Sequence, residues 1–379
     1  MKKIKLFVYF LLAGSFFACA HHSQVQTFTL EKPPSIGTVA EVGNLSLGGF
    51  SGLVKLNGDH YLTLTDRGPN GPMIDFKGDG RSVRPFLLPS YRPQIVFFQL
   101  KEGKIEVEKQ VSIMTTGLPN VPMIDETPST AKGTPLFHNP MGIDSEGIIV
   151  DGIGNFWIVE EYGPSLVKVD PNGQMLNRFL PKTAPFKRTG KKILSAALAK
   201  RRPNRGFEGI TRIGQKLYLV LQSPIDSKSK LVPIVEFDLR TETQTGLYLY
   251  QLDPESDKVG DLTSNSMGEI FVLEQNGKMG TECYRKIYSL TINSQLNVLS
   301  KTGMDNFEGE PVPKKMEYDL HLKDIDQEEK IEGIAWIDEN TVAVIADNDF
   351  GLGFLFDEKT GKIGQMKNNP SKLFIVSKK

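Results

Sequence analysis

The chain has 379 residues, and 45 Lys and Arg residues are balanced by 45 Asp and Glu residues, so the formal net charge is zero. This balance excludes a protein that holds nucleic acid by bulk positive charge, because such proteins need a basic excess to displace counterions. Hydrophobic residues at 39% and charged residues at 24% are typical of a folded globular chain, so extensive disorder is excluded as well.

The N-terminus has the features of an export signal. A short basic segment precedes an apolar run at 6–18, which is too short to span a bilayer. Cleavage can follow Ala20, or Cys19 can become a lipidated N-terminus. We therefore expect residues 1–20 to be a signal peptide. The product is then periplasmic or extracellular, either soluble or held at the bacterial envelope by a lipid anchor.

Cysteine and histidine are scarce. If Cys19 is removed or lipidated, Cys283 has no partner within the chain, and we expect it to be a small buried residue. The chain has five histidines, and their spacing is not that of zinc ligands. They are His21, His22, His60, His138 and His321.

Residues 21–40 form a polar N-terminal segment, and the chain beyond them has the pattern of strands and turns. Short β-branched and aromatic runs are bounded by Gly, Asn, Asp and Pro. Examples of these runs are 61–65, 156–159, 217–221, 270–273 and 341–345. Only 194–202 has helical composition, and it lies inside a basic insertion at 182–205.

One short unit recurs along the chain: an oxygen-bearing side chain, then Gly, then an aliphatic residue. The copies are Ser51-Gly52-Leu53, Glu146-Gly147-Ile148, Glu208-Gly209-Ile210, Glu332-Gly333-Ile334 and a degenerate Gly260-Asp261-Leu262. A second polar group ends the apolar run that follows each unit. These groups are Asp66-Arg67, Glu160-Glu161, Gln222, Glu274-Gln275 and Asp347-Asn348-Asp349. Each copy predicts one sheet whose first strand opens with the repeated unit.

Radial repetition of such sheets is the β-propeller, an architecture that protects strand edges. We expect an all-β fold in which residues 41–379 form a β-propeller with loop insertions and one short helix. Six blades are favoured, and five or seven are alternatives. The intervals between copies exceed the roughly 40–50 residues of one blade. Insertions at 115–140 and 182–205 are therefore expected to lie as loops over one face.

In a propeller the innermost strands line a central channel, so equivalent residues converge on one axis. Carboxylates gathered there repel one another unless protons or a cation neutralise them. Ca²⁺ takes several oxygen ligands and suits such a ring better than Zn²⁺. The predicted metal ligands are Asp66, Glu146, Glu208, Glu332 and Asp347, with Asp261 facing them from the degenerate copy. The alternative is that each acid bonds nearby backbone and fixes a turn.

The second set of polar groups offers binding and catalytic groups. Arg67 follows a strand and a carboxylate, and a guanidinium there can bind a phosphate or carboxylate group. Arg205 and Asn348 are further candidates for substrate binding, and Glu161 is the candidate general base. The alternative at Asp66 and Asn348 is a turn in which the side chain caps local backbone.

These residues resemble the phytase-like domain family, which is also described as esterase-like activity of phytase. The matching motifs are Gly49-Phe50-Ser51-Gly52-Leu53, Thr65-Asp66-Arg67-Gly68, Glu146-Gly147-Ile148, Glu160-Glu161-Tyr162-Gly163-Pro164, Gly206-Phe207-Glu208-Gly209-Ile210, Glu332-Gly333-Ile334 and Asp347-Asn348-Asp349-Phe350-Gly351. The resemblance covers roughly residues 40–375. It implies a β-propeller, usually in exported bacterial proteins, that hydrolyses phosphoester or related ester bonds.

The leading hypothesis is an exported hydrolase in which Ca²⁺, held by the axial carboxylates, assists hydrolysis of a small phosphate ester. One alternative is a non-catalytic, calcium-stabilised envelope propeller that binds a ligand or a protein. Another is a lactone or carboxylester hydrolase. We expect a monomer that binds no nucleic acid and contacts a membrane only through a lipid anchor.

Overall fold

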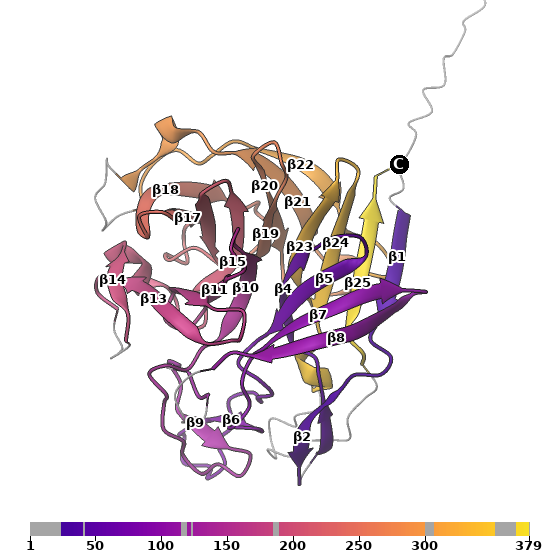
Figure 1. Cartoon of the computed structure of the whole chain (residues 1–379). Coiled ribbons are helices and arrows are strands. Elements are labelled where there is room, and N and C mark those ends of the chain that lie inside the picture. Colours follow the sequence, from indigo (N-terminus) through magenta and orange to yellow (C-terminus); the bar gives the residue numbers. More distant parts are fainter. Residues whose placement is uncertain are drawn as a thin grey trace, which may run out of the picture.

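The computed structural model describes residues 24–40, 42–114, 120–122, 124–184, 189–299, 307–352 and 369–378. Nearly all regular structure in these ranges is strand, which confirms the predicted all-β class (Figure 1). Short 3-10 helices are η1 (Ala196–Lys200), η2 (Gly280–Glu282), η3 (Ser294–Leu296) and η4 (Asp349–Gly351). The predicted signal peptide and Cys19 lie outside the described residues. No helix among those residues has the length and apolarity needed to cross a membrane.

The longer strands form five groups, each running outward from one inner strand. The first and the fifth of these groups are the two halves of one eight-stranded sheet, joined where Thr29 of β1 pairs in parallel with Lys104 of β8. The first group is β4 (Phe50–Lys55), β5 (His60–Thr65), β7 (Gln94–Lys101) and β8 (Lys104–Ser112); the second is β10 (Ser145–Val150), β11 (Phe156–Glu160), β12 (Ser165–Val169), β13 (Met175–Pro181) and β14 (Lys191–Leu194). The third is β15 (Phe207–Ile213), β16 (Lys216–Leu221), β17 (Leu231–Asp238) and β18 (Thr243–Gln251); the fourth is β19 (Lys258–Ser264), β20 (Glu269–Gln275), β21 (Arg285–Thr291) and β22 (Lys314–Asp319); the fifth is β23 (Lys330–Asp338), β24 (Thr341–Asp347), β25 (Lys372–Ser377) and β1 (Gln24–Thr29).

The inner strands contact one another in a cycle: β4 with β10, β10 with β15, β15 with β19, β19 with β23, and β23 with β4. Glycines of the repeated unit allow this approach, because a methyl group added at each would meet the next inner strand. The nearest backbone atoms to that methyl would be Gly147 Cα at 3.1 Å for Gly52, Glu208 O at 2.9 Å for Gly147, Leu262 N at 2.6 Å for Gly209, Ile331 O at 2.6 Å for Gly260 and Gly52 C at 2.8 Å for Gly333. The glycines of the repeat are therefore explained by close packing of strands around one axis.

Apolar cores fill the spaces between neighbouring groups. Trp157 and Phe179 of the second group pack against Phe237 of the third, with ring centroids 4.9 to 5.9 Å apart. Side chains of β-branched and aromatic residues in the two facing sheets are almost fully buried there. Similar clusters lie between the first and second, the fourth and fifth, and the fifth and first groups. The continuous β-branched and aromatic runs of the sequence thus correspond to strands of sheets that bury both faces.

The two ends of the described chain meet in the fifth group. β1 pairs antiparallel with β25 from Gln24 with Ser377 to Thr29 with Lys372. The N-terminal segment predicted at 21–40 therefore contributes a strand to the sheets, and the predicted domain boundary at 41 is too late. The reason is hydrogen bonding: β25 would otherwise present an unpaired edge.

The predicted insertions meet on one side of the molecule (Figure 1). The shorter strands are β2 (Ser35–Val39), β3 (Gly43–Ser46), β6 (Arg84–Phe86) and β9 (Pro128–Thr130). β9 pairs in parallel with β6, and Arg201 donates to Asp125 Oδ2 at 2.9 Å, which links the two insertions. The helix predicted at 194–202 is the 3-10 helix η1, and Leu194 belongs to β14 instead.

Candidate functional site

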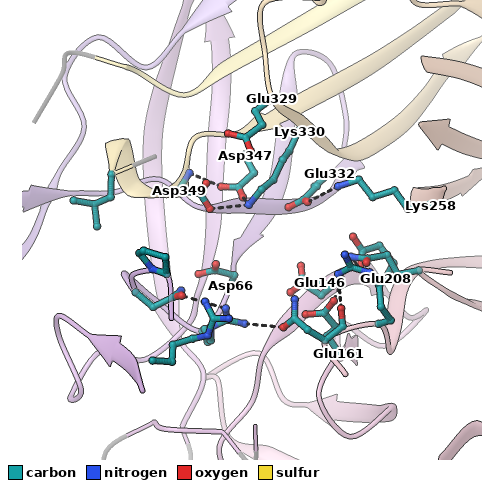
Figure 2. Close-up of a pocket in the computed structure, with 18 of the residues that line it drawn as sticks. Asp66, Glu146, Glu161, Glu208, Lys258, Glu329, Lys330, Glu332, Asp347 and Asp349 are labelled. Atoms are coloured by element: carbon teal, nitrogen blue, oxygen red, sulfur yellow. Dashed lines mark hydrogen bonds and ion pairs between the residues drawn. The ribbon is translucent and has the colours of Figure 1, made fainter. Parts of the chain in front are cut away.

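A cavity of about 610 Å³ opens at the end of the cycle where the inner strands begin. Its lining is dominated by charged side chains (Figure 2). The acidic residues are Asp66, Glu146, Glu161, Glu208, Glu329, Glu332, Asp347 and Asp349, and the basic residues are Arg67, Arg84, Arg205, Lys258 and Lys330. With eight acids and five bases, the lining carries excess negative charge when all groups are ionised.

β-bulges aim three glutamates into this cavity. The pairing of each inner strand with the next strand shifts by one residue at Glu146 in β10, Glu208 in β15 and Glu332 in β23. A bulged residue is left out of the ladder, and the local kink redirects its side chain. The same shift falls at Gly52 in β4 and at Gly260 in β19. The structure therefore aligns Glu146 with Gly52, and the sequence alignment of Ser51 with the glutamates is wrong by one residue.

Three of the acids, Glu146, Glu161 and Glu208, gather on one side of the cavity, and we call them the unpaired acids (Figure 2). Their exposed fractions are 8%, 3% and 1%. Among the residues that the structure describes, no Lys or Arg nitrogen forms an ion pair with them. Gln222 Nε2 bridges two of them, at 3.2 Å from Glu161 Oε1 and 2.8 Å from Glu208 Oε2.

The pKa values of the unpaired acids are raised. Burial is the main cause for Glu146, and the charges of Asp144 and Glu208 raise its pKa further. Burial and Glu161 likewise raise the pKa of Glu208 well above its usual range. Burial and Asp144 raise the pKa of Glu161 to about 8, against the lowering effect of Arg67. Like charges crowded in a dry site disfavour ionisation, so these groups hold protons or need a cation.

The opposite side of the cavity carries its own cations, and we call Glu332, Asp347 and Asp349 the paired acids. Lys330 Nζ lies 3.1 Å from Asp347 Oδ2 and 2.8 Å from Asp349 Oδ1. Lys258 Nζ lies 3.9 Å from Glu332 Oε1. Burial of Asp347 raises its pKa, whereas the pKa of Asp349 is lowered by Lys330 despite burial. Chain cations therefore already offset the negative charge on this side.

Asp66 and Arg67 occupy the rim between the two sides. Asp66 Oδ1 accepts a hydrogen bond of 2.8 Å from the Gly68 N–H, which is the turn-capping alternative stated for this position. Arg67 donates to Asp144 through Nη1 and, from its backbone N–H, to Asp144 Oδ1 at 3.1 Å. Its guanidinium also lies over the Tyr162 ring at 5.0 Å. Arg67 is therefore a fixed, nearly buried cation at the cavity wall.

Eight of the nine predicted site residues line this one cavity. Asn348 is the exception: its Oδ1 accepts from the Gly49 N–H at 3.0 Å and its Nδ2 donates to Asn369 O at 2.7 Å. Both ends of the amide thus bind backbone outside the cavity, and we correct its predicted substrate-binding role to a structural one. Asp261 also differs from prediction. It accepts from the Ile334 and Leu262 N–H groups and does not line the cavity.

The sequence analysis missed Lys258 and Lys330, which line the cavity, and the buried Asp144, which lies beside Glu146 and Glu161. Each lies two residues before the bulge position of its inner strand. Residues two apart share one face of a strand, so the period of two was the signal that could have identified them.

One group of atoms in the cavity could hold a metal ion. A ligand atom from each of Asp144, Glu146 and Glu161 lies within 4.8 Å of the other two, and all three residues are buried. Next to them Gln222 Oε1 is buried and has no hydrogen-bond partner within the described ranges. Carboxylate and amide oxygens are the ligands that Ca²⁺ prefers. The donor set fits a hard divalent cation.

The sheets and the acidic cavity define an all-β protein with a polar site at the shared end of its inner strands. A family model described as "Phytase-like: Esterase-like activity of phytase" matches residues 45–350. The chain therefore belongs to this family, as its motifs predicted.

Other similarities are more distant. An "Uncharacterized secreted protein" of Arthroderma benhamiae is 29% identical over 158 residues, which are 35% of this chain and 31% of that protein. The chain thus matches about a third of the length of this curated relative. An α-L-arabinofuranosidase of Podospora anserina has a TM-score of 0.44 and 10% identity over 94% of this chain and 97% of its own. A gluconolactonase of Xanthomonas campestris has a TM-score of 0.33 and 11% identity over 93% and 97%. No functional statement follows from these two structures.

Proposed function

We propose that the protein is an exported hydrolase, built as a five-bladed propeller, whose axial cavity hydrolyses a phosphate ester with the help of a bound Ca²⁺ ion. The five groups of strands are the proposed blades, and the cycle of inner-strand contacts supports five blades over the favoured six. The observation that carries the functional proposal is the cluster of unpaired acids. Three buried glutamates share one side of the cavity and form no ion pair with a Lys or Arg among the described residues.

The proposed cation ligands are Glu146 and Glu161, with Gln222 Oε1 beside them. Asp144 lies within reach of the same ion, but both of its oxygens accept from Arg67, so it is assigned to the guanidinium. This set differs from the predicted one, because Asp66 caps a turn and Asp347 is paired with Lys330. Glu332 has Lys258 as its nearest cation, so it is left out as well. When bound, Ca²⁺ would supply a positive charge that neutralises the glutamates and polarises the phosphoryl oxygen.

Glu208 is the proposed general base, in place of Glu161, whose oxygen is assigned to the cation. Gln222 Nε2 donates to Glu208 Oε2 at 2.8 Å and so fixes one oxygen of the carboxylate. The ionised carboxylate would accept a proton from the attacking water. A cation held by Glu146 and Glu161 favours that ionised form, because opposite charge lowers the pKa of a carboxyl group.

The basic residues of the cavity would bind the anionic group of the substrate. Arg67 is oriented by Asp144 and Tyr162, and Arg205 is only partly buried at the opening. Arginine suits this role because its planar guanidinium bonds two oxygens of a phosphate at once. Since the lining has more acids than bases, a phosphate ester would be repelled without the cation.

Turnover measurements test the proposal. Purified protein should hydrolyse an aryl phosphate or phytate in the presence of Ca²⁺, and a chelator should abolish the reaction. Absence of chelator-sensitive turnover on every phosphate ester would remove the phosphatase proposal. A large chelator effect on melting temperature without any turnover would favour the non-catalytic binding alternative.

A second candidate is hydrolysis of a lactone or carboxylester. The excess of acids in the cavity favours it, because an uncharged ester is not repelled there. The family description also names an esterase-like activity. Turnover on lactones or aryl acetates, with none on phosphates, would identify this activity in the same assay.

We also propose that the protein is exported and acts as a monomer. The basic and apolar N-terminus and the secreted fungal relative support a periplasmic or extracellular protein. Lipidation at Cys19 would add a membrane anchor, and we propose that the folded part acts as a monomer on a small-molecule ester.

A further inference from the structure

A second cluster of metal-binding side chains lies outside the cavity. One ligand atom from each of Cys283, His321 and Asp326 lies within 4.8 Å of the other two. Cys283 follows η2 in the loop between β20 and β21, and the other two residues lie in the loop between β22 and β23. The chain thus brings a thiol, an imidazole and a carboxylate together from two neighbouring loops.

One oxygen of the Asp326 carboxylate has no hydrogen-bond partner among the described residues. This oxygen is the buried Oδ1, and Asp326 as a whole is 7% exposed. Its Oδ2 lies 3.4 Å from His321 Nδ1. A buried polar atom without a partner destabilises the fold, because it has lost its hydration without gaining a hydrogen bond. A bound cation would give this oxygen a partner. The His321 and Cys283 side chains lie close enough to bind the same cation.

The ligand types select the kind of ion. Thiolate and imidazole groups suit zinc and related transition metals, whereas Ca²⁺ takes oxygen ligands only. Tetrahedral zinc with bonds of about 2.0–2.3 Å separates its ligand atoms by roughly 3.3–3.8 Å. In the cluster His321 Nδ1 and Asp326 Oδ2 are 3.4 Å apart, and all three ligand atoms lie within 4.8 Å of one another. The His321 side chain is 47% exposed, so its ring is not enclosed by the chain.

Buried contacts hold the two loops in place. Arg285 is fully buried and donates to Ile325 O at 2.6 Å and to Glu329 O at 2.8 Å. The Gly280 N–H donates to Asp326 O at 2.9 Å. The backbone around the cluster is therefore fixed from both sides, so a bound ion would require little rearrangement. Burial raises the pKa of the Cys283 thiol to about 11, and a metal ion would have to displace that proton.

We propose that Cys283, His321 and Asp326 bind one zinc-class divalent cation, with water completing the coordination. The ion would join the loop after β20 to the loop that enters β23. Because β23 begins with Lys330, the site supports one wall of the cavity without lining it. The inference does not depend on the proposed hydrolase activity.

Cobalt substitution tests the proposal on the full chain. Cys19→Ser is introduced into every sample, which leaves Cys283 as the sole thiol. Chelator-treated protein is titrated with Co²⁺, and the near-ultraviolet thiolate-to-cobalt charge-transfer band is recorded. We expect one equivalent of Co²⁺ with this band, and its loss when Zn²⁺ is added. The carboxylates of the cavity contain no sulfur and cannot produce the band.

Three variants provide the controls. Cys283→Ser should abolish the band, and His321→Ala should weaken Co²⁺ binding by at least about tenfold, since even outer-shell changes cost 10–100-fold. His60→Ala should leave binding unchanged, because His60 is a comparably exposed histidine whose Nδ1 lies 3.0 Å from Glu108 Oε2, apart from any thiol. His321 is half exposed, so its variant should fold even if the Cys283 variant does not. Absence of the band in the parent protein, or equal binding by His321→Ala, would overturn the proposal.

Discussion

The two sides of the cavity differ in how the negative charge of their carboxylates is compensated. On one side Lys330 lies between Asp347 and Asp349, and Lys258 faces Glu332. On the other, Glu146, Glu161 and Glu208 are buried and, within the described part of the chain, form no ion pair with a lysine or arginine; the Gln222 amide bridges Glu161 and Glu208. Strands β19 and β23 supply a lysine two residues before the bulge, whereas the residue at that position before β10 is an aspartate, Asp144.

This difference distinguishes acids that a lysine of the chain neutralises from acids that remain available to bind a cation. A buried acid with its own lysine is neutralised permanently and has little remaining affinity for a cation. A buried acid without one is left uncompensated when ionised and gains free energy when a divalent ion arrives. The comparison therefore assigns the cation and the chemistry to the unpaired acids, and the framework of the cavity to the paired acids.

The largest expected effect follows removal of the proposed base. Glu208→Gln should lower chelator-sensitive turnover by about 10³-fold, within the range for general acid–base groups. Ca²⁺ affinity should be retained, because Glu208 is not among the proposed ligands. The matched control is Glu317→Gln, an acid paired with Lys315 and Lys378 on the outer strand β22. Equal turnover by Glu208→Gln and the parent protein would exclude Glu208 as the base.

Removal of the Lys330 ammonium group should lower the free energy of unfolding. Lys330→Met leaves Asp347 and Asp349 without their partner, and breaking a buried ion pair costs about 3 kcal/mol of the free energy of unfolding. Chemical denaturation measures this loss. Lys258→Met should cost less, since its contact with Glu332 is 3.9 Å long. An equal loss in both variants would contradict the distinction between close and loose pairing.

The cycle of inner strands supports both sides of the cavity, so its disruption should affect them together. In Gly260→Ala the new methyl group would lie 2.6 Å from Ile331 O and 2.8 Å from Gln275 Nε2. Overpacking of this kind costs about 1–3 kcal/mol of unfolding free energy. Gly277→Ala is the control, because nothing lies within 4 Å of its added methyl. Equal melting temperatures for the two variants would show that the strands do not pack this closely.

The smallest expected effect concerns Glu317, a carboxylate on the outer strand β22 that forms ion pairs with two lysines. Lys315, Lys378 and Ser289 lower the pKa of Glu317 to about 2 against the effect of burial. A carboxyl group with a lowered folded-state pKa stabilises the fold above its unfolded pKa, and that benefit is lost as the pH falls from about 4.5 to 2. Glu317→Gln should reduce this pH dependence by less than about 1 kcal/mol, as for surface ion pairs. Identical pH profiles of unfolding would contradict the assignment.

Much of the fold could be predicted from the sequence because its strands are regular. Continuous β-branched and aromatic runs and the repeated Gly units identified the inner strands, and the family motifs agreed with them. The strand β1 was missed, because its polar sequence becomes a sheet strand only by pairing with β25 at the far end of the chain. Long-range pairing of this kind leaves no local signal.

The acidic residues of the site could be predicted from the sequence, but their individual roles could not. Glu146, Glu208 and Glu332 were identified because each precedes a glycine of the repeat. Which acids are paired could not be predicted, because each lysine meets an acid of another strand only in the folded protein. Lys258 of β19 meets Glu332 of β23, and Lys330 of β23 meets Asp347 of β24. The cluster of Cys283, His321 and Asp326 was missed for the same reason, since their spacing matches no zinc motif.

Calcium titration of chelator-treated protein by isothermal calorimetry tests the assignment of the cation most directly. We predict one Ca²⁺ per chain, lost in Glu146→Gln and retained in Asp349→Asn, because only the first variant alters an unpaired acid. Absence of binding, or binding that survives Glu146→Gln and disappears in Asp349→Asn, would contradict the assignment.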